Sequence, residues 1–220
     1  MKSADLSQSL AMLPVRQASP LDRPLNRALK RGLDLLLVCP ALLVLAPVFG
    51  LLALAVRLDS SGPVLYRQER ISRDGQSFMM LKFRTMHVQA EQQSGPVWAR
   101  PDDPRTTRLG AFLRRASLDE LPQLLNILGG SMSLVGPRPE RPHFVARFSA
   151  EVPGYSARHR AKTGLTGWAQ VHGLRGDTSI EARVQHDLYY LAHWSLWLDL
   201  RIIAATLLTV IRDFTQKRAY

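Results

Sequence analysis

Residues 34–57 read DLLLVCPALLVLAPVFGLLALAVR, and the 22 residues from Leu35 to Val56 carry no charge. A helix of this length can cross the hydrocarbon core of a bilayer. Pro40 and Pro47 each remove a helix hydrogen bond and favour kinks. Because no other stretch of the chain is apolar enough to enclose such a helix in a soluble core, we expect it to associate with a membrane.

The charges beside this stretch indicate how it meets the membrane. Basic residues flank both of its ends: Lys30, Arg31 and Arg57. Since basic residues favour the cytoplasmic face, similar flanks suit a re-entrant helix that enters, turns at Cys39-Pro40 and leaves by the same face. A kinked helix that spans the bilayer is the alternative. We expect a helix-break-helix over residues 25–58.

The overall composition allows one catalytic-sized domain and predicts anionic partners. At 220 residues and 46% hydrophobic content, the chain is short for two full domains. Its net charge is +11, and 24 of its 29 basic residues are arginine, whose planar fork binds phosphate through two hydrogen bonds. Nucleic acid, phospholipid headgroups and phosphorylated small molecules all match this charge. A single cysteine, Cys39, excludes a disulfide framework and indicates a protein that faces the cytosol.

Two further regions complete the division of the chain. Residues 1–24 contain three prolines and no sustained hydrophobic period, so we expect a flexible tail, and they lack the pattern of a signal peptide. Residues 59–220 should form the catalytic domain. The six histidines are scattered without the spacing of metal ligands.

A β-hairpin is predicted just after the apolar stretch. Two runs of strand-forming residues, ending at Arg70 and beginning at Ser77, flank Asp74-Gly75, a typical hairpin turn. Alternation along the second strand places Lys82 and Arg84 on one face. These cations could form a phosphate-facing pair or a solvated face. A surface loop over residues 87–108, which could border a site, should follow.

Two adjacent carboxylates form the candidate reactive centre. Residues 117–124 read SLDELPQL, directly after Arg114 and Arg115. Helix N-termini hold anions, so Asp119 and Glu120 at the start of a helix could lie beside a bound phosphate. The same residues also match an ordinary capping box, or a helix with Asp119 as its N-cap. The leucines that follow have helical spacing and predict a core-facing stripe: Leu121, Leu124, Leu125 and Leu128.

Loops rich in proline and glycine follow this helix. Residues 133–142 read SLVGPRPERP and hold Arg138 between two prolines. Rigid flanks reduce the ordering cost of an arginine that meets an anion, although such a loop can also be a plain connector. A helix is expected near residues 142–149. The glycine-rich segment after it ends in Arg175 and Asp177, which could shape a sugar or nucleotide pocket.

The C-terminal segment, residues 187–211, predicts a helix whose uncharged run is too short to span a membrane. Its aromatic residues are Tyr189, Tyr190, Trp194 and Trp197. Such residues are typical of a helix that lies in the headgroup layer. Burial of the same rings against the domain is the competing interpretation.

Three motifs occur in order behind the proline-broken apolar segment: KFRTM at 82–86, LDELPQL at 118–124 and SLVGPRP at 133–139. Together they resemble the bacterial sugar transferase family, the monotopic polyprenyl-phosphate phosphoglycosyl transferases. GLTGWAQ at 164–170 and WSLWLD at 194–199 are similar to larger members that act in exopolysaccharide synthesis, notably undecaprenyl-phosphate glucose phosphotransferases. Family members often place serine before the helix-breaking proline, whereas here Cys39 precedes Pro40.

This resemblance implies an α+β, mainly helical fold, with a re-entrant membrane helix, a short β-hairpin and interfacial amphipathic helices around one catalytic domain. It implies transfer of a sugar 1-phosphate from a UDP-sugar to undecaprenyl phosphate, with release of UMP. Glucose is the expected sugar, with galactose or an N-acetylated sugar as alternatives. The expected location, among membrane lipids, is the cytoplasmic face of the bacterial inner membrane.

The resemblance also assigns roles to residues at matching positions. It makes Asp119 the nucleophile, and it makes Glu120, with Asp119, the ligand of Mg²⁺. Phosphate-binding positions are Arg114 and Arg138, with Lys82 and Arg84 as further candidates. A basic membrane-bound scaffold would not need the Asp-Glu pair. A nucleic-acid-binding protein would not explain the uncharged stretch, so we expect no nucleic acid partner; the sequence leaves the oligomeric state open.

Overall fold

The computed structural model describes residues 18–90, 95 and 103–215. The α-helices are α2 (Pro24–Asp59), α3 (Arg108–Arg115), α4 (Gln123–Leu128), α5 (Pro142–Glu151), α6 (Trp168–Val171), α7 (Ile180–Ala192) and α8 (Leu196–Thr215). The strands are β1 (Leu65–Ile71), β2 (Ser77–Phe83), β3 (Ser133–Val135) and β4 (Gly164–Thr166). Short 3-10 helices cover Pro20–Asp22, Arg73–Gly75, Leu118–Glu120 and Tyr155–Arg160. The mainly helical prediction is confirmed. Most of the expected tail and residues 91–94 and 96–102 of the expected loop lie outside the described residues.

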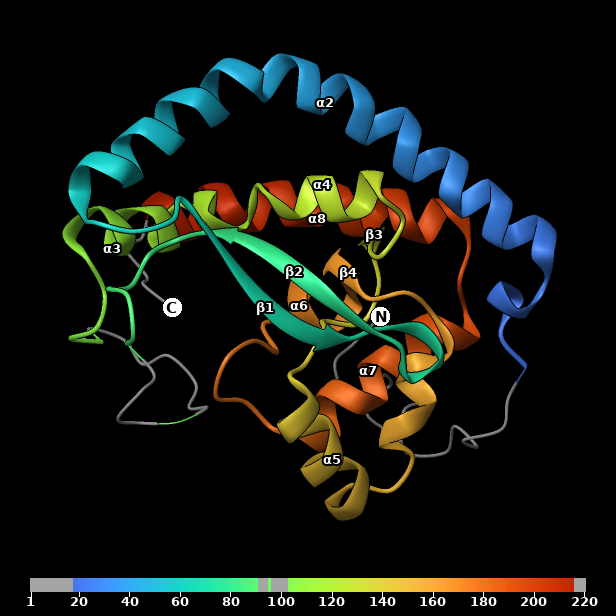
Figure 1. Ribbon diagram of the computed structural model, residues 1–220. Coiled ribbons are helices and arrows are strands. Elements are labelled where there is room, and N and C mark those ends of the chain that lie inside the picture. The colour runs from blue at the N-terminus through green and yellow to red at the C-terminus, as the bar shows by residue number, and fades with distance from the viewer. Residues whose placement is uncertain (1–17, 91–94, 96–102, 216–220) are drawn as a thin grey trace.

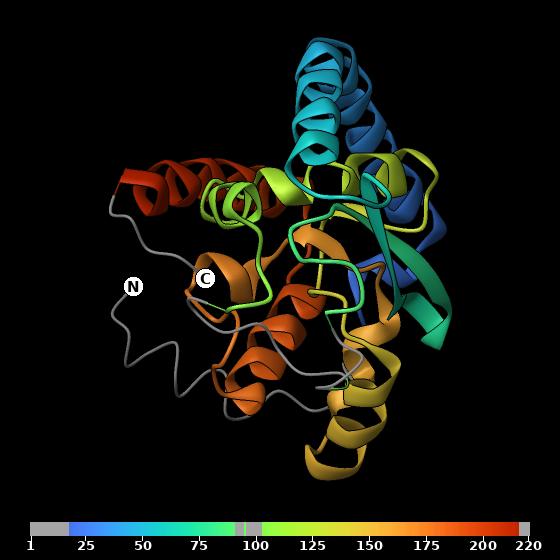
Figure 2. The ribbon, with the colours of Figure 1, turned by 60° about the vertical axis from the view of Figure 1, so that its left-hand side comes forward.

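The helices lie in levels. Figures 1 and 2 show α2 arching across one end of the molecule, α3, α4 and α8 at about one level beneath it, and α5 at the opposite end. The β1–β2 hairpin lies between these levels. One buried cluster joins α2 to α4 through Val38, Leu124 and Ile127. Another joins β3 to the C-terminal helices through Val135 and Tyr190.

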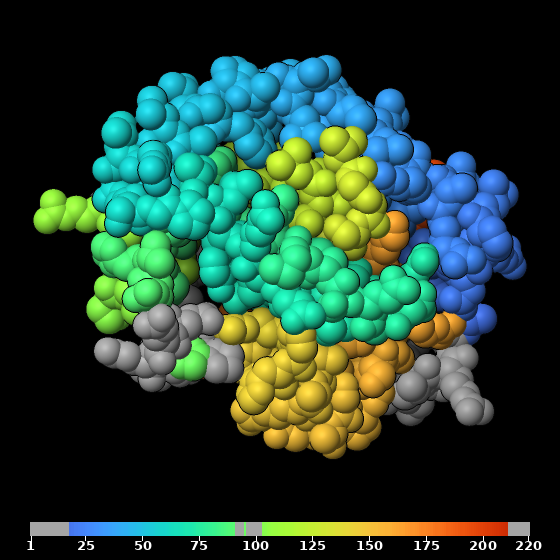
Figure 3. Space-filling model, in the orientation of Figure 1, coloured from blue at the N-terminus to red at the C-terminus, as the bar shows by residue number. Residues whose placement is uncertain are grey.

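The apolar stretch forms the middle of one continuous helix. α2 runs through Pro40, where a break was expected, and through Pro47. Figure 1 shows that the helix curves instead, and proline, which removes helix hydrogen bonds, is a common cause of bending. In Figure 3, α2 forms the upper rim of the molecule, and α4 lies directly below it.

The start of α2 is fixed to the domain by buried charges. The Lys30 ammonium lies 2.7 Å from a carboxylate oxygen of Asp199 in α8, and both side chains are buried. One turn later, Asp34 Oδ1 accepts hydrogen bonds from Ser133 Oγ at 3.0 Å and from the Leu134 amide at 2.9 Å. The same carboxylate therefore ties the helix to β3, which leads into the Arg138 loop.

The end of α2 is fixed to the same domain by Arg84. Its guanidinium donates hydrogen bonds to the carbonyls of Ser60 at 2.6 Å and Ser61 at 2.7 Å. Carbonyls at the end of a helix lack partners within it, so this arginine satisfies groups that would otherwise be left unpaired. Val56 and Phe83, both buried, pack together beside it. Both ends of α2 are thus attached to the same domain.

The rest of α2 presents apolar side chains to the surroundings. Each of these is more than half exposed: Leu36, Leu43, Val44, Leu51, Leu54 and Leu58. A contiguous apolar surface of this kind marks a membrane or partner contact. By length and composition, α2 is also able to cross a membrane.

The predicted hairpin is confirmed. β1 and β2 pair antiparallel, from Leu65 opposite Phe83 to Ile71 opposite Ser77. The turn contains Asp74-Gly75 with positive φ at both residues, the conformation that this pair accepts readily.

A second, parallel pair of short strands joins segments that are distant in sequence. β3 pairs with β4, and Gly136 N donates to Thr166 O at 2.9 Å just beyond them. A Cβ on Gly164 would lie 2.1 Å from Gly136 N, so the two backbones can approach this closely only through glycine. This pairing fixes where the loop that carries Arg138 begins.

The predicted C-terminal helix is two helices. α7 ends at Ala192, and Ser195 begins α8 by accepting a hydrogen bond from the Leu198 amide. Tyr190 and Trp194 are buried, and both donate hydrogen bonds to the Asp199 carboxylate. For these two rings, the burial interpretation is correct and the headgroup interpretation is wrong.

Other local predictions also need correction. Leu124 is buried, but Leu125 and Leu128 are 40% exposed, so the expected leucine stripe is only partly core. At the other end of the chain, the last part of the predicted tail packs on the domain. Leu21 is buried, and Ser19 Oγ donates to the Leu191 carbonyl at 2.6 Å.

His159 predicts a pH-dependent stability. Burial and the nearby Arg158 charge lower the pKa of His159 to about 4, from about 6.5 in the unfolded chain. As the pH falls below the unfolded value, the unfolded state binds a proton that the folded state does not, so stability is lost. Between pH 7 and pH 5 this loss should be about 2 kcal/mol. His159→Gln should therefore narrow the gap between the Tm values measured in detergent at these two pH values; an unchanged gap would contradict the assignment.

Candidate active site

The two adjacent carboxylates lie at a sharp turn between α3 and α4. Asp119 and Glu120 belong to the 3-10 helix Leu118–Glu120, which follows Ser117 at φ 55°. Ser117 makes no side-chain cap, so the capping-box alternative is wrong. Asp119 is not an N-cap either, since it lies inside this turn and Pro122 precedes α4.

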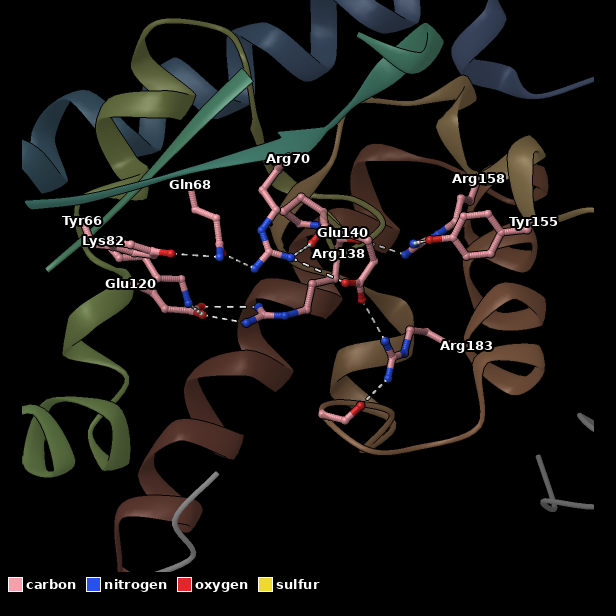
Figure 4. Close-up of polar contacts among 12 residues, drawn as sticks. Tyr66, Gln68, Arg70, Lys82, Glu120, Arg138, Glu140, Tyr155, Arg158 and Arg183 are labelled. Carbon is pink, nitrogen blue, oxygen red and sulfur yellow. Dashed lines mark hydrogen bonds and ion pairs between the residues drawn. The ribbon is translucent and has the colours of Figure 1, made fainter. Parts of the chain in front are cut away.

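Cations from two other elements meet these carboxylates. Lys82 Nζ, on β2, lies 2.7 Å from Glu120 Oε1 and 3.7 Å from Asp119 Oδ2. Arg138 places Nη2 2.7 Å from the same Glu120 oxygen and Nη1 3.4 Å from the other. Figure 4 shows Lys82 and Arg138 converging on Glu120. The structure therefore brings Lys82 and Arg138, which are distant in sequence, to the adjacent carboxylates of Asp119 and Glu120.

The two carboxyl groups have opposite pKa shifts. Burial raises the pKa of Asp119, although the charge of Lys82 opposes the shift. Burial would also raise the pKa of Glu120, but the charges of Arg138 and Lys82 hold it well below its ordinary value. Glu120 is thus ionised at neutral pH, while Asp119 is the more basic carboxylate. Neighbouring carboxyls with separated pKa values commonly have separate chemical roles.

Arg114 completes the positive surroundings of Asp119. It lies in the last turn of α3, and its Nε donates to Thr85 Oγ1 at 2.9 Å. Burial lowers the pKa of Arg114, and the nearby charge of Asp119 opposes that shift. An anionic group that approached Asp119 would therefore meet positive charge from Arg114, Lys82 and Arg138.

A sequence model of the bacterial sugar transferase family matches residues 25–213. This chain belongs to the bacterial sugar transferase family. The match includes residues 25–59 of α2 and the whole carboxylate cluster, which comprises Lys82, Arg114, Asp119, Glu120 and Arg138.

Named relatives are similar to most of this chain. The chain is 46% identical over 206 residues to the UDP-glucose:undecaprenyl-phosphate glucose-1-phosphate transferase of Escherichia coli (strain K12). This match covers 90% of the chain and 44% of the relative. The chain is 45% identical over 208 residues to a Caulobacter vibrioides protein of the same name, covering 92% and 77%. It is 40% identical over 198 residues to the UDP-N-acetylgalactosamine-undecaprenyl-phosphate N-acetylgalactosaminephosphotransferase of Aeromonas hydrophila, covering 89% and 47%. The chain spans less than half the length of the Escherichia and Aeromonas relatives.

Three other candidate residues lie outside the carboxylate cluster. Arg84 turns to the end of α2, where its contacts are structural. Arg175 and Asp177 lie in the loop between α6 and α7. Asp177 is exposed and lines a hollow between α5 and α7 whose lining residues include none of the cluster.

The carboxylate pair is a suitable donor set for Mg²⁺. Among the described residues, no group of three or more His, Cys, Asp or Glu side chains could hold a metal ion. Mg²⁺ is usually bound by one or two carboxylates together with substrate phosphates, so a larger protein cage is not required. Asp119 and Glu120 can supply those oxygens, because each ionised carboxylate has more lone pairs than its present contacts use.

Several residues that support the site were not predicted. Glu140 accepts hydrogen bonds from Arg183 at 3.0 Å and Arg70 at 3.5 Å, and Arg158 reaches the backbone of Arg138 (Figure 4). The only sequence signal was that Glu140 directly follows the Pro-Arg-Pro motif. The partners come from β1, the 3-10 helix Tyr155–Arg160 and α7, and sequence spacing does not reveal such contacts.

Proposed function

We propose that this transferase moves a sugar 1-phosphate, with glucose as the expected sugar, from a UDP-sugar to undecaprenyl phosphate as the first membrane step of exopolysaccharide or capsule synthesis. The observation that carries the proposal is a buried, basic carboxylate, Asp119, surrounded by three cationic side chains. A carboxylate can attack a phosphorus atom, and surrounding cations offset the charge that gathers during phosphoryl transfer.

The reaction has two displacements at one phosphorus atom. In the first, an Asp119 oxygen forms a bond to the sugar-bearing phosphorus of the UDP-sugar, and the bond to the bridging oxygen breaks, so UMP leaves with that electron pair. In the second, a phosphate oxygen of undecaprenyl phosphate attacks the same phosphorus. The Asp119 carboxylate then leaves, and undecaprenyl diphosphate sugar is the product. No external base is needed when Asp119 attacks as the carboxylate, the form that the charge of Lys82 favours, because undecaprenyl phosphate is also an anion.

The surrounding side chains have distinct proposed roles. Arg138 and Arg114 bind phosphate oxygens, and Lys82 holds the two carboxylates together while it lowers the pKa of Asp119 toward an ionised state. Glu120, whose pKa is held well below its ordinary value, is the proposed Mg²⁺ ligand with Asp119. Bound Mg²⁺ would neutralise phosphate charge. The ion pairs with Lys82 and Arg138 hold the Glu120 carboxylate in place.

The names of the relatives support glucose. The Escherichia and Caulobacter relatives are both named for UDP-glucose, whereas the Aeromonas relative is named for N-acetylgalactosamine at lower identity. Glucose is therefore our first proposal for the sugar, and an N-acetylated sugar is the second.

We further propose that α2 is a re-entrant helix at the cytoplasmic face of the inner membrane. Lys30 fixes its start and Arg84 its end to one domain, so a crossing helix would have to release one of these attachments. The exposed apolar outer face of the arch suits insertion into one leaflet. α3, α4 and α8 also carry exposed apolar side chains, which suits helices at the headgroup level: Phe112, Leu125, Leu128, Trp197, Leu200, Leu207 and Leu208.

The re-entrant proposal predicts the effect of Pro40→Leu. Leucine restores a hydrogen bond and favours a straight helix, since proline in a helix interior costs about 3 kcal/mol. Single reporter cysteines can replace the exposed residues Arg23 and Ser61 in a Cys39→Ala background. Without Pro40→Leu, both reporters should be labelled from the cytoplasmic side. With it, the reporter at 23 should move across in part of the population. Labelling from opposite sides before any change at Pro40 would reject the proposal.

A donor screen tests the proposed reaction. Purified protein in detergent, with undecaprenyl phosphate and Mg²⁺, is given UDP-glucose, UDP-galactose, UDP-N-acetylglucosamine or UDP-N-acetylgalactosamine, and UMP release is measured. We expect the fastest release from UDP-glucose and loss of release when EDTA removes the metal. Release of UMP from none of the four donors would reject the proposed function.

A further inference from the structure

Each of the four backbone carbonyls of residues 137–140 accepts a hydrogen bond. Pro137 O accepts a hydrogen bond from Gly164 N at 2.9 Å, and Glu140 O accepts one from Ile71 N at 3.0 Å. These two bonds come from the backbone of neighbouring segments. They hold the two ends of the Pro-Arg-Pro turn but leave its middle to other partners.

Two arginine side chains hold the middle of this turn. Arg158 Nη2 donates to the Arg138 carbonyl at 2.9 Å, and Arg70 Nη1 donates to the Pro139 carbonyl at 3.1 Å. Figure 4 shows Arg158 approaching the turn from the side opposite Glu120. Arg158 therefore holds the backbone of the same residue whose side chain pairs with Glu120.

Arg158 uses all three of its nitrogen atoms in buried contacts. Besides the Arg138 carbonyl, its Nε lies 2.9 Å and its Nη2 2.7 Å from Asp187 Oδ2, and its Nη1 donates to the Tyr155 hydroxyl at 3.1 Å. The residue is 1% exposed. It cannot touch a substrate directly, so any part in the reaction must pass through Arg138.

The buried pair needs an explanation other than stability. Replacing a buried ion pair with apolar residues of similar volume is often neutral or stabilising, because both charges must leave water when the protein folds. Apolar side chains could fill this region, since Phe144, Phe148 and Val184 already pack around Tyr155. What apolar residues could not supply is a hydrogen bond to the Arg138 carbonyl.

We propose that Arg158, held by Asp187 and Tyr155, is a positioning residue that fixes the Arg138 backbone so that the Arg138 guanidinium meets the carboxylate pair and the substrate phosphate. The expected effect on catalytic rate rests on the proposed function. The expected effect on the conformation of residues 137–140 does not. Misplacement of a phosphate-binding group by about 1 Å can cost about 10²-fold in rate, so a support of this kind can be important without touching substrate.

The test removes the hydrogen bond to the Arg138 carbonyl without leaving Asp187 or Tyr155 as an unpaired buried polar group. A triple variant, Arg158→Met with Asp187→Leu and Tyr155→Phe, deletes the charges and the hydroxyl together. We expect a Tm within a few degrees of that of the parent protein. A second variant, Arg158→Lys, retains a charge for Asp187 but has no fork to reach the Arg138 carbonyl as well. It serves if the triple variant does not fold. The control, Arg147→Gln with Glu151→Gln, deletes an exposed pair on α5.

Amide hydrogen exchange measures the local stability of the Pro-Arg-Pro turn without any substrate. In the triple variant, or in Arg158→Lys, amide exchange in peptides that cover residues 133–142 should become at least about tenfold faster, while the core of α7 stays protected. The control should show no change. Unchanged exchange in this segment of a folded variant would overturn the proposal, whether or not the protein transfers sugar phosphate.

Kinetics then separates positioning from general structure. We expect a fall in kcat of about 30- to 100-fold in the triple variant, with KM for the UDP-sugar changed less than kcat. In an Arg138→Ala background the same changes should cost less than about threefold, because the group they position is gone. Full additivity of the two effects would overturn the proposal. Absence of UMP release by the parent protein would reject the proposed function alone, because the exchange result would stand.

Discussion

Asp119→Asn should reduce UMP release by at least about 10⁴-fold, to the background of the assay. The amide has nearly the same shape as the carboxylate but cannot form the bond to phosphorus that the first displacement requires. Burial raises the pKa of Asp119, which means that the folded protein disfavours its charged form. The neutral asparagine should therefore leave the Tm unchanged or higher. UMP release and thermal unfolding of the same preparation check both expectations.

The control for this change is Asp74→Asn. Asp74 is an exposed carboxylate in the hairpin turn, with φ 58°, a conformation that asparagine also accepts. We expect its activity to equal that of the parent protein. Turnover by Asp119→Asn above a tenth of the parent rate would exclude Asp119 as the nucleophile.

Arg138→Lys should lower kcat/KM by about 10²-fold, although the charge is retained. Arg138 meets Glu120 with both terminal nitrogens, at 2.7 and 3.4 Å, and this fork can bridge Glu120 and a phosphate oxygen at once. A lysine ammonium on a flexible stem is a point charge and cannot hold that geometry. Steady-state kinetics with varied UDP-sugar measure the loss.

Two comparisons limit the interpretation of this result. Arg114→Lys should show a loss of similar size, because Arg114 lies beside Asp119 and is held by Thr85. Arg147→Lys, at a surface position, should show almost none. Equal tolerance at all three positions would mean that the arginines provide only a general basic surface.

The elements that the sequence predicted well depend on local signals. The β1–β2 hairpin follows from Asp74-Gly75 between strand-forming runs, and its second strand carries Lys82 to Glu120. The carboxylate pair was found because Asp119 and Glu120 are adjacent and follow two arginines. Their conformation was not predictable from the same residues. Ser117 has a left-handed φ and forms no side-chain cap, and Leu118 and Leu121 belong to a cluster that also contains Phe83 of β2. The local sequence does not reveal this long-range packing.

The elements that the sequence predicted poorly depend on long-range contacts. Arg84 was expected to share a role with Lys82, because strand alternation reports which face a side chain lies on and not what lies beyond it. The end of α2 lies there, and the carbonyls of Ser60 and Ser61 just after it accept hydrogen bonds from the Arg84 guanidinium. Similarly, the continuous helical appearance of residues 187–211 gave no sign that Ser195 would begin a new helix. That break lets Tyr190 and Trp194 reach Asp199.

The buried support of Arg138 was beyond sequence reasoning. Arg158 and Asp187 are 29 positions apart, in a chain with 24 arginines, so no pattern singles out this pair. The parallel β3–β4 pairing was equally hidden, because it depends on glycine at two backbones that come together only in the folded protein.

The most direct test of the central claim is to trap the sugar phosphate on Asp119. Protein is mixed with UDP-glucose and Mg²⁺ without undecaprenyl phosphate, quenched, digested, and analysed by mass spectrometry, with UMP measured in parallel. We predict a burst of about one UMP per enzyme and a hexose phosphate adduct on the peptide that contains Asp119. Addition of undecaprenyl phosphate should remove the adduct and give an equal amount of lipid-linked product. UMP release that requires undecaprenyl phosphate from the start, with no adduct on Asp119, would contradict the covalent mechanism.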